Sequence, residues 1–539
     1  MSTLPVRRLG AAGIVTDTHP ADIEDPAVFT AGVNVRFRNG RVSRGPVFRT
    51  IATLDIEPGH AIAIPPSSGG YDEVVIVSAD YGKLLRLNGT LFEDVTPEGH
   101  SGSADITSIT SSFLGGVSYI NRESHAPLYK SPGDSTYLTI PAFPDDVRFR
   151  VLRAYKDQLI GLGVTKGGRY FPTMVKWSDL TGFGAPPPSW ETDSTTNSAG
   201  ENIVNEMQHS IIDGLALRNS FIIYCTNSVW SMDYTGTDQI YQWTKLFDES
   251  GVIAPNCVVQ VAGQHFVFDK ADIYVHDGIA PRSIASSQVK EFVFDALDTA
   301  KAHLCFVTHD ARMGEVRFCY PSADRLVGFV NPQTGCNRAA VYNYGNSTWT
   351  FYDLPNVTGA CRSALISGKS WESDQEVSWD AAEGLFLTSE GDESQHALFV
   401  SRGAPGQGLT ASRLYGLDLL DGTLPSPIEP EAMKPAFVER TGLDLDIIGK
   451  NLTQYTHLQA IWPQISVERP EDSYWQFGAN DLVNEEPVWS DETSFDPRTE
   501  SKIDINESGK YLAYRFGLRG TGDFRLSGFD VQLVIRGRR

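Results

Sequence analysis

Residues 72–95 read DEVVIVSADYGKLLRLNGTLFEDV, and the fold of the chain is recognisable from the pattern in this stretch. Short runs of β-branched and aliphatic residues alternate with polar residues, and turn residues separate the runs at 80–82 and 88–89. Runs of about four to eight such residues bounded by Asp, Asn and Gly are typical of strands joined as hairpins. The stretch therefore predicts a hairpin followed by a further strand.

The same pattern returns along the chain, at 220–236, 264–284, 315–321 and 339–355. Apolar residues at helical spacing are rare, so strands dominate the prediction. Units of three or four strands recur about every 40–50 residues, which is typical of propeller blades. We therefore predict an all-β fold with a β-propeller-like body of six or seven blades, an extended N-terminal segment and a smaller C-terminal β-sandwich. Two unrelated β-sandwiches with similar hairpins are the alternative.

Changes in composition and in strand pattern mark the expected domain boundaries. Residues 1–55 are predicted to be an extended N-terminal segment that makes an interface, and residues 56–424 hold the repeats of the propeller-like body. Four prolines fall within PSPIEPEAMKPAFVER, so residues 425–442 are predicted to be a linker. Residues 443–539 contain enough strand patterns for the C-terminal β-sandwich.

The charge balance bears on possible partners. Asp and Glu total 67 against 45 Lys and Arg, a formal net charge of -22, which disfavours a protein that grips nucleic acid. No apolar run is long enough for a spanning helix, and the first residues show no sustained apolar leader, so we expect no membrane anchor. The six cysteines form no CxxC pair, and we expect free buried thiols in a chain made in a reducing cytoplasm.

β-propellers include several classes of enzyme, so the sequence motifs of catalysis bear on the function of this chain. GxSxG, HExxH, P-loop and calcium-loop patterns are absent from the sequence. Eleven histidines are scattered, and His265 and His276, on two strands of one predicted hairpin, suit a structural role as well as a metal. We therefore expect no catalytic residue, no metal site and no cofactor.

Two turns are predicted to be structural. Asp80 and Gly82 lie in the turn of the hairpin quoted above, where Ser and Asp side chains accept hydrogen bonds from nearby backbone N–H groups. Asn39 and Gly40 form an Asn-Gly pair between two short strand patterns, which is typical of a hairpin turn with positive φ.

Four arginines alternate along the N-terminal segment: Arg36, Arg38, Arg41 and Arg44. Alternate residues of a strand share one face, so these side chains are predicted to clamp an acidic surface or phosphates of a partner. An exposed edge strand protected by charge is the alternative.

A resemblance to a known family rests on four stretches, in order along the chain: VNVRFRNGRVSRGPVF (33–48), VKWSDLTGFGAPPPSW (175–190), residues 247–278, and residues 508–539. The set resembles the tail nozzle proteins of short-tailed bacteriophages, also called tail tubular protein B or phage stabilisation proteins. The chain departs from that pattern at Asn256-Cys257, at Lys270-Ala271 and in the longer loop at 185–188.

The resemblance implies a structural virion protein rather than an enzyme, located in the viral tail and synthesised in the cytoplasm of a host bacterium. It implies a homohexamer below the portal and its head-to-tail adaptor ring, next to tail fibres or tail tip proteins. The six chains would retain the packaged genome and conduct double-stranded DNA during ejection. An acidic wall would let the duplex pass without sequence-specific binding. Arg36, Arg38, Arg41 and Arg44 would then contact the adaptor ring or a neighbouring subunit.

A different class of function stays open at this point. A monomeric propeller that binds or hydrolyses glycans, as sialidases do, would have similar blades, and tryptophan rings could stack on its sugars. The candidates are Trp177, Trp190, Trp230, Trp243 and Trp349. Burial of these rings inside the blades is the alternative interpretation.

Overall fold

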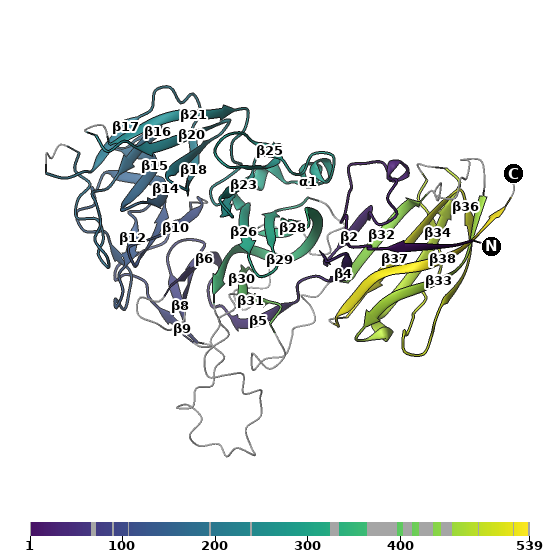
Figure 1. Ribbon diagram of the computed structural model, residues 1–539. Helices are drawn as coiled ribbons and strands as arrows, with labels where there is room; N and C mark the ends of the chain where they lie inside the picture. Colours follow the sequence, from purple (N-terminus) through teal and green to yellow (C-terminus); the bar gives the residue numbers. More distant parts are fainter. Residues whose placement is uncertain are drawn as a thin grey trace, which may run out of the picture.

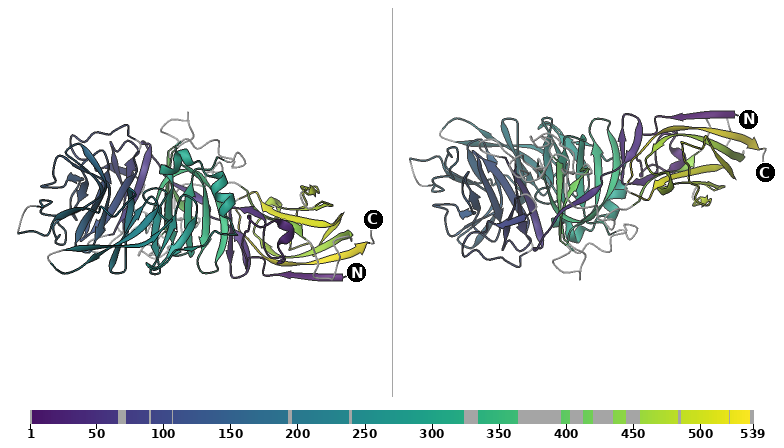
Figure 2. Two further views of the ribbon diagram at one scale, coloured as in Figure 1. Left: turned by 90° about the horizontal axis from the view of Figure 1, so that it is seen from above. Right: turned by 90° about the horizontal axis from the view of Figure 1, so that it is seen from below.

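The computed structural model describes residues 2–536 except for 66–71, 89–90, 106, 193–195, 238–239, 324–333, 364–395, 403–411, 420–434, 444–454, 483–484 and 521. Regular structure in this part of the chain is nearly all β-strand, with one short α-helix, α1 (Lys290–Ala296). Figure 1 shows a ring of radiating sheets at one end of the molecule and a β-sandwich at the other. The two further views in Figure 2 show that the molecule is elongated along the line joining these domains.

Five blades of the ring are consecutive four-stranded antiparallel sheets. Each begins at the centre of the ring and ends at its rim. Their strands are β6 (Pro58–Ile64), β7 (Glu73–Ser78), β8 (Leu84–Asn88) and β9 (Leu91–Asp94) in blade one; β10 (Ile109–Leu114), β11 (Val117–Arg122), β12 (Leu128–Lys130) and β13 (Leu138–Thr139) in blade two; β14 (Val147–Tyr155), β15 (Gln158–Lys166), β16 (Arg169–Trp177) and β17 (Gly200–Ile203) in blade three; β18 (Ile211–Leu217), β19 (Ser220–Cys225), β20 (Ser228–Tyr234) and β21 (Tyr241–Asp248) in blade four; β22 (Val258–Val261), β23 (Gln264–Phe268), β24 (Ile273–His276) and β25 (Arg282–Ser283) in blade five.

Blades six and seven share one long strand, β29 (Thr348–Ser363). Its first half pairs with β28 and its second half with β30, and the register shifts between Val357 and Gly359. Asn356 has a φ of 51 degrees beside this shift, where the strand passes from the rim of one blade to the centre of the next. The other strands are β26 (Phe306–Asp310), β27 (Glu315–Tyr320) and β28 (Cys336–Asn343) in blade six, and β30 (His396–Ser401), β31 (Arg413–Leu417) and β5 (Phe48–Thr53) in blade seven.

The ring closes because β5, which precedes blade one in the sequence, pairs with a strand of blade seven. β5 pairs with β31 as the outermost strand of blade seven, and the chain then continues into β6 of blade one. At the centre, Thr358 on β29 donates a hydrogen bond to the carbonyl of Pro58 on β6, at 2.9 Å. The prediction of an all-β, propeller-like body is confirmed, and the described residues form seven blades.

The second domain is a sandwich of two antiparallel sheets. Trp475, Phe516, Tyr514 and Phe529 pack between the sheets with ring centroids 4.8 to 6.5 Å apart. One sheet consists of β1 (Ser2–Arg7), β3 (Val35–Arg38), β4 (Arg41–Arg44), β38 (Phe524–Arg536), β33 (Tyr455–Val467) and β36 (Ile503–Gly509); the other consists of β2 (Ala31–Val33), β32 (Ala436–Leu443), β37 (Tyr511–Leu518), β34 (Ser473–Asn480) and β35 (Val488–Trp489). Both chain ends lie at the tip of this sandwich farthest from the propeller (Figure 1).

Two expected boundaries are corrected by the strand pairing. Residues 1–55 are not a separate extended segment, because β1 to β4 complete the sandwich and β5 completes blade seven. Their apolar side chains supply the physical reason: Phe29 and Phe37 are buried and stack with centroids 5.8 Å apart. The predicted linker is also shorter, since β32 begins at Ala436 and is a strand of the sandwich. Residues 425–434 of that prediction lie outside the described part of the chain.

The two domains are joined along β29. The Asn34 side chain accepts a hydrogen bond from the Asp353 backbone at 3.0 Å, and its backbone N–H donates to the Phe351 carbonyl at 2.8 Å. Thr350 donates to the carbonyl of Val35 at 2.8 Å. Because the sandwich strand β3 and blade six share these bonds and one apolar core, the domains form a single body.

The predicted turns have defined structures. Asp80 accepts hydrogen bonds from the Ser78 hydroxyl at 2.5 Å and from the Gly82 backbone at 2.9 Å, and the positive φ of the turn falls on Tyr81. Asn39 and Gly40 have φ values of 52 and 72 degrees between paired Arg38 and Arg41, as a type I′ hairpin turn requires.

Candidate functional site

The four predicted arginines do not form one exposed clamp. Arg36, Arg38 and Arg41 lie on one face of the β3–β4 hairpin, whereas Arg44 lies on the other face, opposite Val35. Arg36 and Arg44 are each 6% exposed, and only Arg38 and Arg41 reach the surface. The prediction of an interface through Arg36 and Arg44 is therefore wrong, because both side chains lie inside the folded body.

Arg36 belongs to a buried ionic network at the junction of the domains. Its Nε donates to Glu315 at 2.8 Å, and one terminal nitrogen lies 2.7 Å from Asp418. Glu315 also accepts hydrogen bonds from Arg317 at 2.8 Å and from the Tyr352 hydroxyl at 2.8 Å. Burial alone would raise the pKa of Glu315, but Arg36 and Arg317 hold it below its usual value. The network is a structural joint, not a binding surface.

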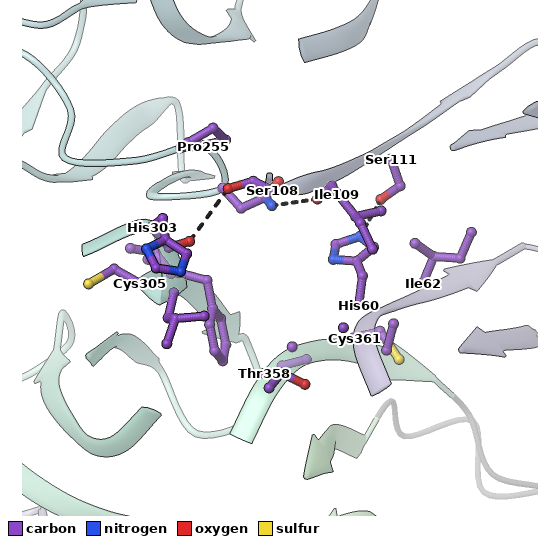
Figure 3. A pocket seen from close by; sticks show the side chains of 18 of the residues that line it. His60, Ile62, Ser108, Ile109, Ser111, Pro255, His303, Cys305, Thr358 and Cys361 are labelled. Atoms are coloured by element: carbon purple, nitrogen blue, oxygen red, sulfur yellow. Dashed lines mark hydrogen bonds between the residues drawn. The ribbon is translucent and has the colours of Figure 1, made fainter. Parts of the chain in front are cut away.

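An axial cavity of about 360 Å³ lies at the centre of the propeller, where the innermost strands of the blades converge (Figure 3). Residues of all seven innermost strands line it, with loop residues between them. Figure 3 shows His60 and His303 on opposite sides of the cavity, with Thr358 below them. His60 shares a hydrogen bond with Ser111 at 2.9 Å, and Ser108 donates to the His303 carbonyl at 3.4 Å.

Asn256 closes part of this cavity from the loop before β22. Its amide donates to the Ile109 carbonyl of blade two at 2.9 Å and accepts from Arg153 of blade three at 2.9 Å. Asn256 has a φ of 64 degrees, a left-handed conformation that asparagine adopts more readily than most residues. In the sequence, Asn256 is notable only as a departure from the family pattern. In the structure, its side chain connects the loop before blade five to blade two.

Three arginines line the cavity, and none of them stands out in the amino-acid sequence. Arg153 makes a two-point pair with Asp213, at 2.9 and 2.8 Å, and donates to the Ser111 carbonyl at 3.0 Å. Arg122 donates to Thr107 at 3.2 Å and to the Ala79 carbonyl at 2.9 Å. Arg402 donates to the Pro58 carbonyl at 2.8 Å. No local motif links these three residues, because only the closed ring brings them together.

Both cavity histidines are held neutral. Burial, together with the nearby Arg153, lowers the pKa of His60 to about 4. Burial and the charge of Arg402 lower the pKa of His303. The cavity therefore presents guanidinium charge, and its imidazoles act as neutral hydrogen-bonding groups near pH 7.

The other candidate residues have structural environments. His265 and His276 face each other across β23 and β24 and both share hydrogen bonds with the Tyr224 hydroxyl, at 2.7 and 2.6 Å. In the described part of the chain, no group of three or more His, Cys, Asp or Glu side chains is placed to hold a metal ion. All six cysteines are free and buried. No helix among the described residues is long and apolar enough to cross a membrane.

The tryptophans offered for sugar stacking are mostly inside the blades. Trp177, Trp190, Trp230 and Trp349 are buried, with 7% or less of each residue exposed, and Trp243 is half-buried. Four of the five tryptophan rings therefore lie in the cores of the blades, as the alternative interpretation expects.

Comparison with known proteins gives no family. No family model matches the chain, and no curated protein matches it. Among solved structures, YCF48 bound to D1 peptide is 10% identical over 72% of this chain and 98% of its own, with a TM-score of 0.33. The Cps50 (Swd1) β-propeller domain of Myceliophteria thermophila is 10% identical over 58% of this chain and 95% of its own, with a TM-score of 0.34. The fold therefore rests on the strand pairing of this chain itself.

Proposed function

We propose that this protein is a structural subunit of the tail nozzle of a short-tailed bacteriophage. Six copies would surround the tail axis below the portal and adaptor ring, retain the packaged genome and conduct double-stranded DNA during ejection. The proposal gives the protein no catalytic role, and it places the protein in the virion tail after synthesis in the host cytoplasm.

The observation that carries the proposal is the ordered set of four resembling stretches. In the fold, the first and last stretches come from opposite ends of the chain and meet in one sheet, where Ser43 pairs with Arg525 and Val42 with Leu526. The two middle stretches run through blades three and five. The four stretches therefore lie in both domains of the folded chain, so the resemblance is not limited to one hairpin or one blade.

Exposed apolar side chains indicate where subunits would meet. Leu180 is 57% exposed and Phe183 is 78% exposed, in the loop between β16 and β17 within the second resembling stretch. Phe183 lies over the Gly115-Gly116 turn of blade two. Large apolar side chains exposed together are typical of protein interfaces. This loop replaces the buried arginines as the proposed contact between neighbouring copies.

The DNA path would run between subunits. The propeller's own axis holds a cavity of about 360 Å³ that Asn256 partly closes, a volume suited to a small molecule and not to a duplex. A chain with a net charge of -22 can present an acidic wall toward a channel on the sixfold axis. Such a wall would repel phosphate and leave the duplex free to slide.

Particle incorporation tests the proposal. Phage assembled with the unaltered chain should contain six copies per particle by quantitative mass spectrometry. The double variant Leu180→Ser, Phe183→Ser should stay folded, because both side chains are exposed, yet enter particles at a greatly reduced level. Leu91→Ser is the matched control, since Leu91 is 74% exposed in blade one, outside the resembling stretches. A chain absent from purified particles would overturn the nozzle role, and unchanged entry of the double variant would overturn the contact loop alone.

The glycan-binding alternative receives no support from the tryptophans. Sugar stacking needs an exposed ring face, and four of the five candidate rings are buried. A propeller that stays monomeric and changes its intrinsic fluorescence on glycan addition would favour that alternative.

A further inference from the structure

The lining of the axial cavity is chemically unlike the rest of the chain. Among the described residues that line it are Arg122, Arg153 and Arg402, but no Asp or Glu, although acids outnumber bases in the whole sequence by 67 to 45. Glu123 and Arg150 line an adjoining cavity of about 160 Å³ that shares Thr107, Ser108, Pro255 and His303 with the axial cavity. The charged residues that line the axial cavity are therefore all basic, although the chain as a whole is acidic.

Two of the three arginines keep unused donors. Arg153 is neutralised by its two-point pair with Asp213. Arg122 uses two hydrogen bonds, to Thr107 and the Ala79 carbonyl, and Arg402 uses one, to the Pro58 carbonyl. A guanidinium has five N–H donors, so both groups retain several without a protein partner, and neither makes an ion pair within the described residues. Arg122 is only 1% exposed, so little of its side chain contacts bulk solvent.

The two guanidinium groups also repel each other. Burial lowers the pKa of Arg402; the negative charge of Glu57 opposes this shift, and the smaller repulsion by Arg122 adds to it. Burial likewise lowers the pKa of Arg122, against the attraction of Asp105 and Asp80. Arg122 is buried and Arg402 is half-buried, and an anion that accepts hydrogen bonds from both guanidinium groups would offset their positive charge.

We propose that the axial cavity binds a small molecule carrying a carboxylate or phosphate group, held by Arg122 and Arg402. Hydroxyl groups of Ser108, Ser111 and Thr358 also line the cavity and suit a ligand with further polar atoms. The apolar side chains of Ile109, Val258 and Phe306 line the remainder. At about 360 Å³ the cavity falls at the small end of ligand pockets, which excludes a polymer.

Inorganic phosphate is the first probe, measured on the full-length protein by isothermal titration calorimetry and by the shift in thermal midpoint at constant ionic strength. Phosphate should bind and raise the midpoint, whereas sodium chloride of equal ionic strength should not. Acetate, tested in parallel, distinguishes a carboxylate site from a phosphate site. Binding of neither anion would overturn the proposal.

Variants locate the binding. Arg402→Gln should weaken phosphate or acetate binding by at least about tenfold, because a charge-assisted pair of hydrogen bonds is lost. Arg282→Gln is the matched control, since Arg282 is exposed on the rim strand β25 and should leave binding unchanged. Equal affinity of the Arg402→Gln variant would contradict the assignment.

A measurement on the unaltered chain avoids any folding defect of the variants. Crystals soaked in tungstate should show an anomalous peak inside the axial cavity, between Arg122 and Arg402. Tungstate peaks found only on the outer surface would overturn the proposal. The anion site requires only a folded propeller. A cavity that binds no anion would therefore leave the proposed nozzle role standing, and a chain that stays monomeric would leave the proposed anion site standing.

Discussion

The Arg36 guanidinium lies 2.8 Å from the Glu315 carboxylate, and this buried ion pair connects the β-sandwich to blade six of the propeller. Arg36 precedes Glu315 by 279 residues, so the pair exists only after both domains have folded and docked. It explains why an arginine that the sequence suggests for a partner surface is 6% exposed. The joint also fixes the sandwich to the propeller, which a rigid tube wall would need.

Removing one partner of this pair should destabilise the protein. Arg36→Ala leaves Glu315 and Asp418 short of a cation, and breaking a buried pair in this way costs about 3–5 kcal/mol. Arg38→Ala, on the same strand but exposed, should change the free energy of unfolding by less than about 0.5 kcal/mol. Urea unfolding of both variants measures the difference. Equal stabilities would show that the joint contributes nothing.

The turn at Gly40 should not tolerate a branched side chain. Gly40 has a φ of 72 degrees between β3 and β4, and a β-branched residue in that conformation costs about 1–2 kcal/mol. Gly40→Val should therefore lower the thermal midpoint measured by circular dichroism. Gly182→Val is the control, because a side chain at Gly182 meets no atom within 4 Å. Identical melting of the Gly40→Val variant and the unaltered chain would contradict the turn assignment.

Much of the propeller could be predicted from local pattern, because each blade is made of neighbouring strands whose turns carry Asp, Asn and Gly. The hairpin from β7 to β8, with Ser78 and Asp80 in its turn, is an example. The closing strand β5 could not be predicted in this way, since its partner β31 lies more than 350 residues away. The same holds for β1, which pairs with β38 at the other end of the chain.

The axial cavity could not be predicted from the sequence for a related reason. Arg122, Arg153 and Arg402 come from different blades and approach one another only when the ring has closed. The arginines of the β3–β4 hairpin were misplaced because Arg44 and Arg36 fall on opposite faces once the two-residue turn sets the register. Alternation in sequence predicts a shared face within one strand, but not across a turn.

Stability should fall as the solution is acidified from about pH 6.5 toward pH 4. Burial lowers the pKa of His60 and of His265 to about 4 and that of His276 to about 3. The unfolded chain takes up these protons near pH 6.5 and the folded chain does not, so each histidine favours folding above that pH. The free energy of unfolding is lower by roughly 3 kcal/mol per histidine near pH 4 than near pH 6.5.

A single variant isolates one of these histidines. His60→Gln keeps a hydrogen-bonding group beside Ser111 but cannot titrate, so the plot of unfolding free energy against pH between 6.5 and 4 should become less steep. Ser210→Ala, just before β18, serves as the control, because it removes no titratable group and should leave the slope as it is. The account of His60 would be contradicted by parallel slopes for the two variants. The Glu315 network contributes separately at lower pH, because its pKa is held below the usual range despite burial.

The cysteines should be inert in the folded protein. All six are buried, and burial raises the pKa of Cys225 and of Cys361 to about 12. A thiolate is the reactive form, so a chromogenic disulfide reagent at pH 8 should modify fewer than one thiol per folded chain. All six should react in urea. Rapid reaction of Cys305 or Cys361, which line the axial cavity, would show that reagents enter it freely.

The most direct test of the nozzle role is cryo-electron microscopy of the full-length protein mixed with its cognate portal and adaptor ring. The account predicts six copies arranged around the axis below the adaptor, with the β16–β17 loop between neighbours and a channel on the sixfold axis. Dispersed single molecules, with the portal and adaptor bare, would contradict it.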